Sequence, residues 1–220
     1  MKVLIILTGF RQNEEYKLFG LCFEKYCKTL KQYCEVFVHS NNIENNILDS
    51  IQYIETNKRI YITDKNSGFR NGGLEALSDV VDMLKLFSND CQYQYVIHLH
   101  PDVFITNEQP ILSLLEQELN SDNVFYCNLS LVNPCLYSFD CFIFKPKLLS
   151  ENIFKNWQEN VNSPELYLYE CITKNNLKHV LLDRYVDNWY LEQRKSPDLL
   201  GLWHSHELDL IVDFINKTIA

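Results

Sequence analysis

The chain has 220 residues, of which 46% are hydrophobic and 22% are charged, as in an ordinary globular protein. Its formal net charge of −9 lacks the basic footprint of nucleic-acid-binding proteins, so we expect no nucleic-acid partner. No apolar stretch approaches the roughly 20 residues that span a bilayer, and no signal peptide is recognisable, so we expect no transmembrane segment. The chain is long enough to bury a sizeable core.

The eight cysteines form no C-x-x-C pair and no spacing typical of a disulfide framework. Most of them lie in apolar stretches, where free cysteine behaves as a small hydrophobic residue. Four disulfides are formally possible, but a chain of this size with its own core does not depend on them. We therefore expect reduced thiols and a cytoplasmic location.

Strand and helix patterns alternate through the first half of the chain. Runs of β-branched residues and leucine predict strands at 3–7, 35–39, 59–63 and 94–100. Apolar residues at helical spacing predict helices between them, at 16–30, 47–54 and 74–87. Such an alternation implies parallel βαβ units with right-handed crossovers.

The second half has a different character, because its strands are closer together in sequence. Pro110 is suited to the first turn of a helix. The remaining patterns predict strands at 124–131, 140–145 and 179–182, helices at 146–159 and 164–172, and then an irregular tail. Since no repeat or linker divides the chain, we expect one domain over 1–220, with a nucleotide-binding half at roughly 1–105 and a half that shapes an acceptor site at roughly 106–220.

The segment His98-Leu99-His100-Pro101-Asp102 places polar residues at the end of an apolar strand. In open α/β sheets, this carboxyl edge is where ligands bind. Side chains alternate along a strand, so His98 and His100 share a face, and Asp102 can rejoin it beyond the proline. Imidazole and carboxylate together suit a divalent cation such as Mn²⁺. The alternative is two histidines satisfied within the protein and an aspartate in a turn.

The succession of βα units, followed by a strand that ends in His100-Pro101-Asp102-Val103-Phe104, resembles a small GT-A-fold glycosyltransferase. In that fold a D-x-D motif ends the strand and holds a divalent cation against the diphosphate of a nucleotide sugar. Asp102 stands at the second aspartate of the motif, whereas His100 replaces the first.

Three further stretches strengthen the resemblance. Residues 7–11 end the first strand, where such enzymes begin their nucleotide pocket. Residues 140–146 are similar to the strand after the motif, whose leading aspartate often faces the acceptor. Trp203-His204-Ser205-His206 lies near the C-terminus, where many members place a histidine that completes the metal shell.

The resemblance implies an α/β fold: a single GT-A-like, Rossmann-related domain with a mostly parallel central sheet and helices on both faces. It also implies a cation, with Mn²⁺ expected ahead of Mg²⁺, whose candidate ligands are His100, Asp102, His204 and His206. In an extended segment the two C-terminal histidines can face the same way. The alternative to a metal-binding role for these two histidines is that they belong to a polar loop beside Trp203.

A second group of residues is expected to bind the nucleotide sugar. Glycine lets a backbone approach a ligand closely, helix N-termini favour anions, and the arginine fork suits a diphosphate. The candidates are Thr8, Gly9, Arg11, His39, Ser40, Arg70, Asn71, Gly72, Gly73 and His100. The alternatives are a helix cap at Asn71 and ordinary loop polarity at the strand ends.

Two carboxylates are candidates for acid–base catalysis. In an inverting enzyme, a carboxylate would deprotonate the acceptor hydroxyl as a general base. Asp140 is preferred as this base or as an acceptor anchor, with Glu165 second. Glu165 can instead simply favour the N-terminus of its helix.

The expected function is transfer of a hexose from a nucleoside diphosphate sugar to a hydroxyl acceptor, a glycan or another alcohol, with a divalent cation at the diphosphate. One alternative is a sugar nucleotidyltransferase, although no glycine-rich basic signature follows the first strand. The other is a non-catalytic sugar- or nucleotide-binding protein, which the histidine at position 100 keeps open.

Overall fold

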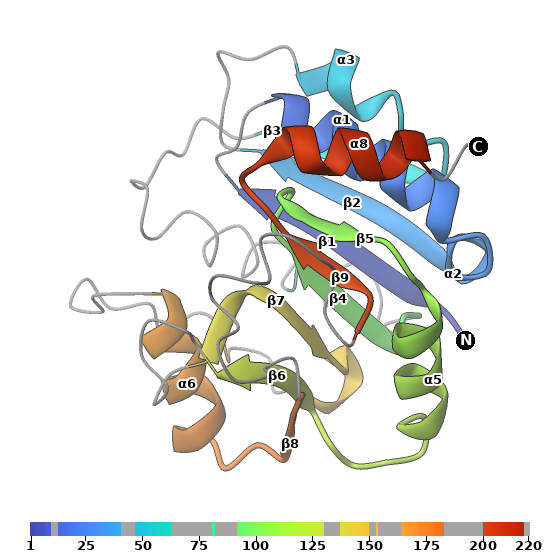
Figure 1. Ribbon diagram of the computed structural model, residues 1–220. Coiled ribbons are helices and arrows are strands. Elements are labelled where there is room, and N and C mark those ends of the chain that lie inside the picture. The colour runs from blue at the N-terminus through green and yellow to red at the C-terminus, as the bar shows by residue number, and fades with distance from the viewer. Residues whose placement is uncertain are drawn as a thin grey trace.

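The computed structural model (Figure 1) describes residues 1–9, 13–40, 47–62, 81, 92–129, 137–149, 153, 164–182 and 200–217. Its centre is a seven-stranded sheet in the order β3-β2-β1-β4-β7-β6-β8. These strands are β1 (Val3–Gly9), β2 (Cys34–Ser40), β3 (Lys58–Ile62), β4 (Tyr95–Leu99), β6 (Phe125–Leu129), β7 (Tyr137–Phe144) and β8 (His179–Leu181).

Most neighbouring strands of this sheet run parallel. β1 pairs in parallel with β2 and β4, β2 with β3, and β6 with β8. β7 is antiparallel to both of its neighbours, β4 and β6. The prediction of an α/β fold with a mostly parallel central sheet is therefore confirmed.

A second, two-stranded sheet lies beside the first. It consists of β5 (Val103–Ile105) and the antiparallel strand β9 (Leu202–His204), with Val103 opposite His204. After β9 comes the helix α8 (Leu208–Lys217). The prediction of an irregular tail is wrong here, because β9 gains its backbone partner from a distant segment and α8 buries Ile211 and Ile215 against the core.

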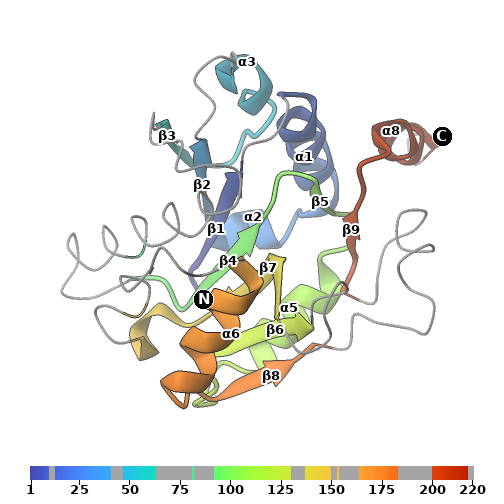
Figure 2. The same ribbon diagram turned by 90° about the vertical axis from the view of Figure 1, so that its left-hand side faces the viewer.

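The helices cover both faces of the large sheet. They are α1 (Asn13–Tyr26), α2 (Leu30–Tyr33), α3 (Ile47–Ile51), α5 (Gln109–Gln117), α6 (Pro164–Lys174) and α8, with a 3₁₀ turn at Pro146–Leu148. Residues of α1, α5 and α8 form one hydrophobic core with β5 and β9, and α6 contributes to the core on the other face. Figure 2 shows α1, β5, β9 and α8 together on one side of β1 and β2.

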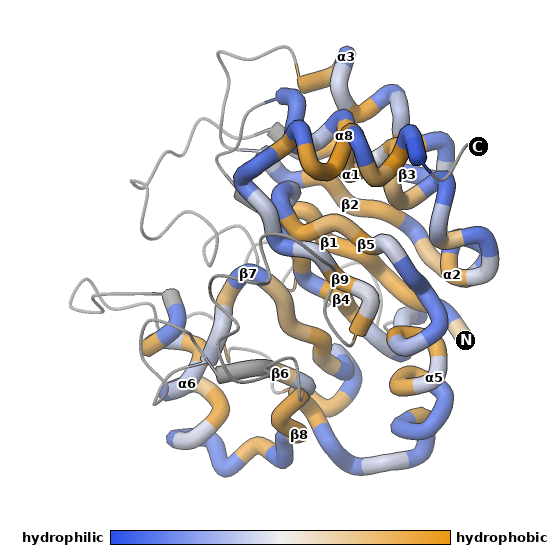
Figure 3. Tube along the Cα trace, in the orientation of Figure 1, coloured by the Kyte–Doolittle hydropathy of each residue, from blue (hydrophilic) through white to orange (hydrophobic). Residues whose placement is uncertain are grey.

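Hydrophobic residues follow the strands, as the colouring of β1 and β2 in Figure 3 shows. Alternate residues of β1 enter the two cores, with Ile5 in one and Ile6 in the other. On α1, Tyr16, Phe19 and Phe23 repeat at helical spacing and are fully buried. The apolar residues that led to the prediction of β1 and α1 are thus buried in the structure.

Two predicted helices are corrected. The helix expected at 16–30 ends at Tyr26, and α2 begins at Leu30, where the Glu108 carboxylate accepts backbone N–H bonds from Thr29 and Leu30. In the described part of 146–159, the 3₁₀ turn is followed by Leu149 in an extended conformation. Pro146 suits the first turn of either helix type, so it does not distinguish them. The helix expected at 74–87 lies outside the described residues, apart from Val81.

Six of the eight cysteines lie in the described residues, and all six are free thiols. Five of them are buried, which agrees with their expected role as small hydrophobic residues. In the part of the chain that the structure describes, no helix has the length and apolar character needed to cross a membrane.

Candidate metal centre

Asp102 lies in the turn that links β4 to β5, at the carboxyl end of β4. The turn is closed by a hydrogen bond from the Val103 N–H to the His100 carbonyl at 3.0 Å. The Asp102 side chain is fully buried. The strand alternation that relates His98 to His100 therefore ends before Asp102.

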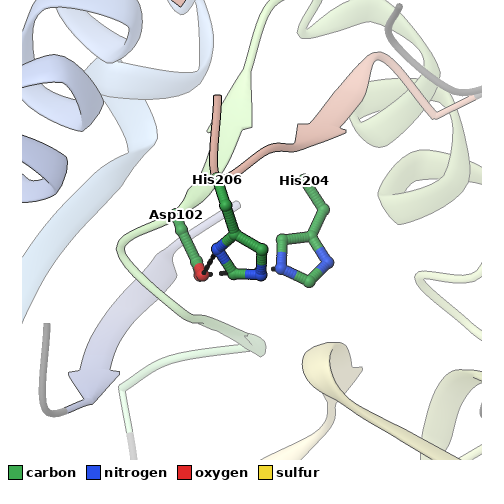
Figure 4. A group of neighbouring side chains, drawn as sticks. All are labelled: Asp102, His204 and His206. Atoms are coloured by element: carbon green, nitrogen blue, oxygen red, sulfur yellow. Dashed lines mark ion pairs between the residues drawn. The ribbon is translucent and has the colours of Figure 1, made fainter. Parts of the chain in front are cut away.

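β9 and the two residues after it bring His204 and His206 to Asp102 from a segment about a hundred residues later. The pairing of Val103 with His204 and a hydrogen bond from the Ser205 N–H to the Asp102 carbonyl, at 3.1 Å, fix the register. Because His204 and His206 are two residues apart, an extended backbone directs both side chains to the same side. Figure 4 shows both imidazoles beside the Asp102 carboxylate.

The three side chains form a compact group of nitrogen and oxygen donors. Asp102 Oδ2 lies 3.3 Å from His206 Nδ1 and 3.5 Å from His204 Nε2. One ligand atom from each residue lies within 4.8 Å of the others. His206 is 45% exposed and His204 25%, so the cluster is open on the side opposite the buried carboxylate.

A second carboxylate lies on the other side of His204. Asp140, on β7, has its Oδ2 3.1 Å from His204 Nδ1, and its side chain is 14% exposed. The pairing of β6 with β7 shifts register between Cys127 and Leu129, opposite this part of β7. Such irregularities re-aim side chains next to functional sites. His204 therefore lies between two carboxylates.

Charge around His204 controls its protonation. Burial by itself would lower its pKa, but hydrogen bonding and charge attraction from Asp102 and Asp140 outweigh that effect and raise the pKa to about 10. Without a cation, His204 is therefore an imidazolium that balances the two carboxylates. A divalent cation would supply the same positive charge and displace the proton.

The donors fit a hard or borderline divalent cation. Imidazole nitrogen and carboxylate oxygen are both accepted by Mn²⁺, whereas a purely oxygen shell would favour Mg²⁺ or Ca²⁺. A fully buried carboxylate needs a compensating positive charge, which a cation between Asp102 and the two histidines would provide. With three ligands from the protein, the cation would still have coordination positions open for a bound substrate.

His100 is not part of this group. Its ring lies 5.6 Å from the His98 ring and 5.8 Å from the Phe139 ring, measured between centroids. His100 therefore stays a predicted ligand that lies outside the Asp102-His204-His206 cluster. The other three predicted ligands, Asp102, His204 and His206, are brought together.

The carboxyl ends of β1 and β2 lie side by side. Thr8 is paired with His39 and Gly9 with Ser40 in the β1–β2 register. Thr8 is fully buried, and its hydroxyl lies 2.8 Å from Nε2 of His98. Burial lowers the pKa of His39 to about 4 and that of His98 well below its usual value, so both are neutral at pH 7.

The remaining predicted residues are not part of the cluster. Glu165 lies in the first turn of α6. Arg11, Arg70, Asn71, Gly72 and Gly73 lie outside the described residues.

Two features of the site were missed from the sequence. One is the contact between Asp140 and His204, which depends on the register shift of β7 and leaves no local pattern. The other is Gly201, which precedes β9 at a φ of +71° and lies against Asn107. A glycine just before the Trp-His-Ser-His segment is the one signal that could have indicated a constrained turn there.

Neither a protein-family model nor a curated protein sequence matches the chain. Solved structures do resemble it. A mannosyltransferase from Pyrobaculum calidifontis, PcManGT, solved with GDP-Man and Mn²⁺, has a TM-score of 0.59 at 9% identity, over 87% of this chain and 59% of the mannosyltransferase. The chain therefore spans less than two thirds of that protein's length.

Two further structures match nearly the whole chain. The galactosyltransferase LgtC, in complex with donor and acceptor sugar analogues, has a TM-score of 0.58 at 9% identity, over 99% of this chain and 96% of LgtC. A 4-diphosphocytidyl-2C-methyl-D-erythritol synthase from Anaerococcus prevotii has a TM-score of 0.51 at 11% identity, over the same shares of the two chains. Together with the sheet order and the Asp-His cluster, these likenesses show that the chain has the GT-A-type fold of nucleotide-sugar glycosyltransferases.

Proposed function

We propose that this protein is a glycosyltransferase that moves a sugar from a nucleoside diphosphate donor to a hydroxyl acceptor, with a divalent cation at Asp102, His204 and His206. The observation that carries the proposal is the convergence of these three side chains on a GT-A-type fold. The cluster follows the end of a strand in a mostly parallel sheet, which is where such folds bind ligands.

The donor set favours a cation that also binds diphosphate. Bound there, the cation would neutralise the negative charge that develops on the departing nucleoside diphosphate. Asp102 supplies an anionic oxygen from a fully buried position, and the more exposed His206 lies on the open side. Because two of the three ligands are imidazoles, we propose Mn²⁺ ahead of Mg²⁺.

The nucleotide sugar would lie along the neighbouring strand ends. Thr8, Gly9, His39 and Ser40 end β1 and β2 next to each other, and we propose that they contact the nucleoside. The sugar is proposed to be a hexose, and the acceptor a glycan or another alcohol bound by the half of the chain after β5. Glu165 stays a proposed acceptor-side carboxylate outside the cluster.

A sugar nucleotidyltransferase is the second candidate. The likeness to the diphosphocytidyl-methylerythritol synthase favours it, since that protein is matched over 96% of its length. The two reactions differ in the bond that breaks. A glycosyltransferase cleaves the bond between sugar and diphosphate, whereas a nucleotidyltransferase releases pyrophosphate from a nucleoside triphosphate.

A binding panel tests the proposal. Nucleoside diphosphates and their sugars, each with and without Mn²⁺, should raise the melting temperature selectively, because a ligand stabilises the folded state that binds it. Slow release of free sugar from the stabilising donor would then show cleavage of the glycosyl bond. Pyrophosphate release from a triphosphate and a sugar phosphate would instead support the nucleotidyltransferase, and binding without either product would support a non-catalytic protein.

Replacing the buried ligand gives the first prediction. Asp102→Ala should weaken Mn²⁺ binding by more than about 100-fold, since even residues that only support a metal ligand cost 10–100-fold. Isothermal titration with Mn²⁺ measures the change, and circular dichroism checks that the variant folds. Asp213→Ala removes an exposed carboxylate on α8 and serves as the control. Equal Mn²⁺ affinity in Asp102→Ala and Asp213→Ala would remove Asp102 from the metal site.

A further inference from the structure

The shortest of the three carboxylate–imidazole contacts in the cluster involves a residue outside the proposed ligand set. His204 Nδ1 lies 3.1 Å from Asp140 Oδ2, whereas His204 Nε2 lies 3.5 Å from Asp102 Oδ2. The two nitrogens of one ring thus face two different carboxylates. A histidine that binds a metal through one nitrogen commonly donates the N–H of the other to a carboxylate.

The backbone of β7 places Asp140 for this contact. Cys127 on β6 is opposite Phe142, and Leu129, two residues further, is opposite Tyr137. β7 therefore carries extra residues between Tyr137 and Phe142, and the strict alternation of side chains is lost there. Phe139 enters one core and Cys141 the other, and the Asp140 carboxylate between them reaches His204.

We propose that Asp140 is a positioning residue whose carboxylate accepts the His204 Nδ1–H and holds the ring with Nε2 directed at the cation. The inference rests on the proposed function, because it requires a cation at Asp102, His204 and His206. It gives Asp140 a role in the metal site in place of the general base expected from the sequence. The contact with Asp140 is made at the ring nitrogen that faces away from Asp102, so this hydrogen bond would fix the tautomer of His204 as well as the orientation of its ring.

The isosteric variant Asp140→Asn tests the role. Asparagine keeps the shape of the side chain, but its amide can donate as well as accept, so one tautomer of His204 is no longer enforced. The Kd for Mn²⁺ should rise by about 10–100-fold, as for other residues that support a metal-bound histidine. Glu207→Gln removes one negative charge from the exposed residue beside His206 and should leave the Kd near the parent value.

The tautomer of His204 supplies a readout that a merely structural role would not move. In protein with ¹⁵N-labelled histidine and bound Zn²⁺ as a diamagnetic probe, long-range ¹H–¹⁵N spectra should show the proton of His204 on Nδ1. His204→Gln identifies the resonance. In Asp140→Asn, at the same Zn²⁺ concentration, the same spectra should show an additional His204 population that is not bound through Nε2. A parent protein with the His204 proton on Nε2 would overturn the inference even if the Asp140 variant failed to fold.

The outcomes separate this inference from the proposed function. If the parent binds Mn²⁺ and Asp140→Asn binds it equally well while kcat for sugar transfer falls, Asp140 acts on the acceptor and the inference is overturned alone. If the parent binds no divalent cation, the proposed function is overturned together with the inference. A weakened Mn²⁺ affinity in Asp140→Asn, with an unchanged affinity in Glu207→Gln, supports both.

Discussion

At the scale of single residues, the described buried charges are each matched by specific partners. Glu35 pairs with Arg59 and accepts a hydrogen bond from the Tyr93 hydroxyl. Lys145 donates to the carbonyls of Glu118 and Ser121 at the end of α5, at 2.6 Å each. Asp102 differs because its carboxylate faces two imidazoles, and imidazole is a group that can exchange a proton for a metal.

This exchange makes Mn²⁺ affinity dependent on pH. The neighbouring carboxylates raise the pKa of His204 to about 10, so the cation-free protein carries this proton at pH 7 and must release it when a cation binds. Affinity should therefore rise with pH, by up to about tenfold per unit for one released proton. Calorimetric titrations between pH 6.5 and 8, in buffers of different ionisation enthalpy, count the protons. No proton release would contradict His204 as a ligand.

At the scale of elements, the site depends on how β9 joins β5. The Gly201 carbonyl accepts hydrogen bonds from the Thr106 N–H at 2.8 Å and the Thr106 hydroxyl at 2.9 Å. Beyond β9, Phe214 of α8 packs against Trp203 and Tyr26 with ring centroids 5.6 and 5.4 Å apart. The two histidines are thus held between an anchored turn and an anchored helix.

Gly201 is the position at which this arrangement is most sensitive. Its φ of +71° disfavours any other residue, and an added Cβ would lie 2.2 Å from the Asn107 carbonyl oxygen. Gly201→Ala should cost at least the roughly 1–2 kcal/mol of a left-handed conformation. If this strain displaces β9, Mn²⁺ affinity should fall by about 5–30-fold. Calorimetric titration measures the Mn²⁺ affinity, and Asp213→Ala, at an exposed position of α8, is the control. An unchanged affinity in Gly201→Ala would contradict the prediction and show that β9 tolerates the strain.

At the scale of the whole molecule, ionisable histidines are buried near the carboxyl ends of the strands. His39 and His98 are buried and neutral near the carboxyl edge of the sheet, and desolvation lowers the pKa of each. The unfolded chain takes up protons at these histidines at higher pH than the folded protein does. Acid should therefore favour unfolding through them.

The free energy of unfolding should fall as the pH decreases from 6.5 toward 4, the range between the ordinary pKa of histidine and that of buried His39. The slope from one such histidine is at most about 1.4 kcal/mol per pH unit, because the unfolded state binds the extra proton. Urea unfolding of the parent and His39→Gln at pH 7, 5.5 and 4.5 measures it. The variant should lose less stability in acid; identical losses would exclude a contribution from His39.

Much of the described fold was predictable from the sequence, because β1, β2, β4 and α1 bury the same residues that define their patterns. The three residues of the cluster could also be named, since alternation in an extended segment directs His204 and His206 together. That His100 lies outside this cluster could not be seen beforehand, because only Pro101 separates it from Asp102. The contact of Asp140 with His204 depends on distant pairing, which no local pattern records, whereas α8 carries apolar residues at helical spacing and was missed although its pattern is local.

The pairing of Val103 with His204 joins segments about a hundred residues apart. Forming the cation site therefore carries the entropic cost of bringing these two distant segments together. Contacts of this separation form late, after the local βα units. A growing chain can therefore build β1, β2 and β4 around their core while Asp102 still lacks both imidazoles. Capture of a cation would then mark the completion of folding, and a fragment that stops between Leu182 and His204 would contain all seven strands of the large sheet and lack the site.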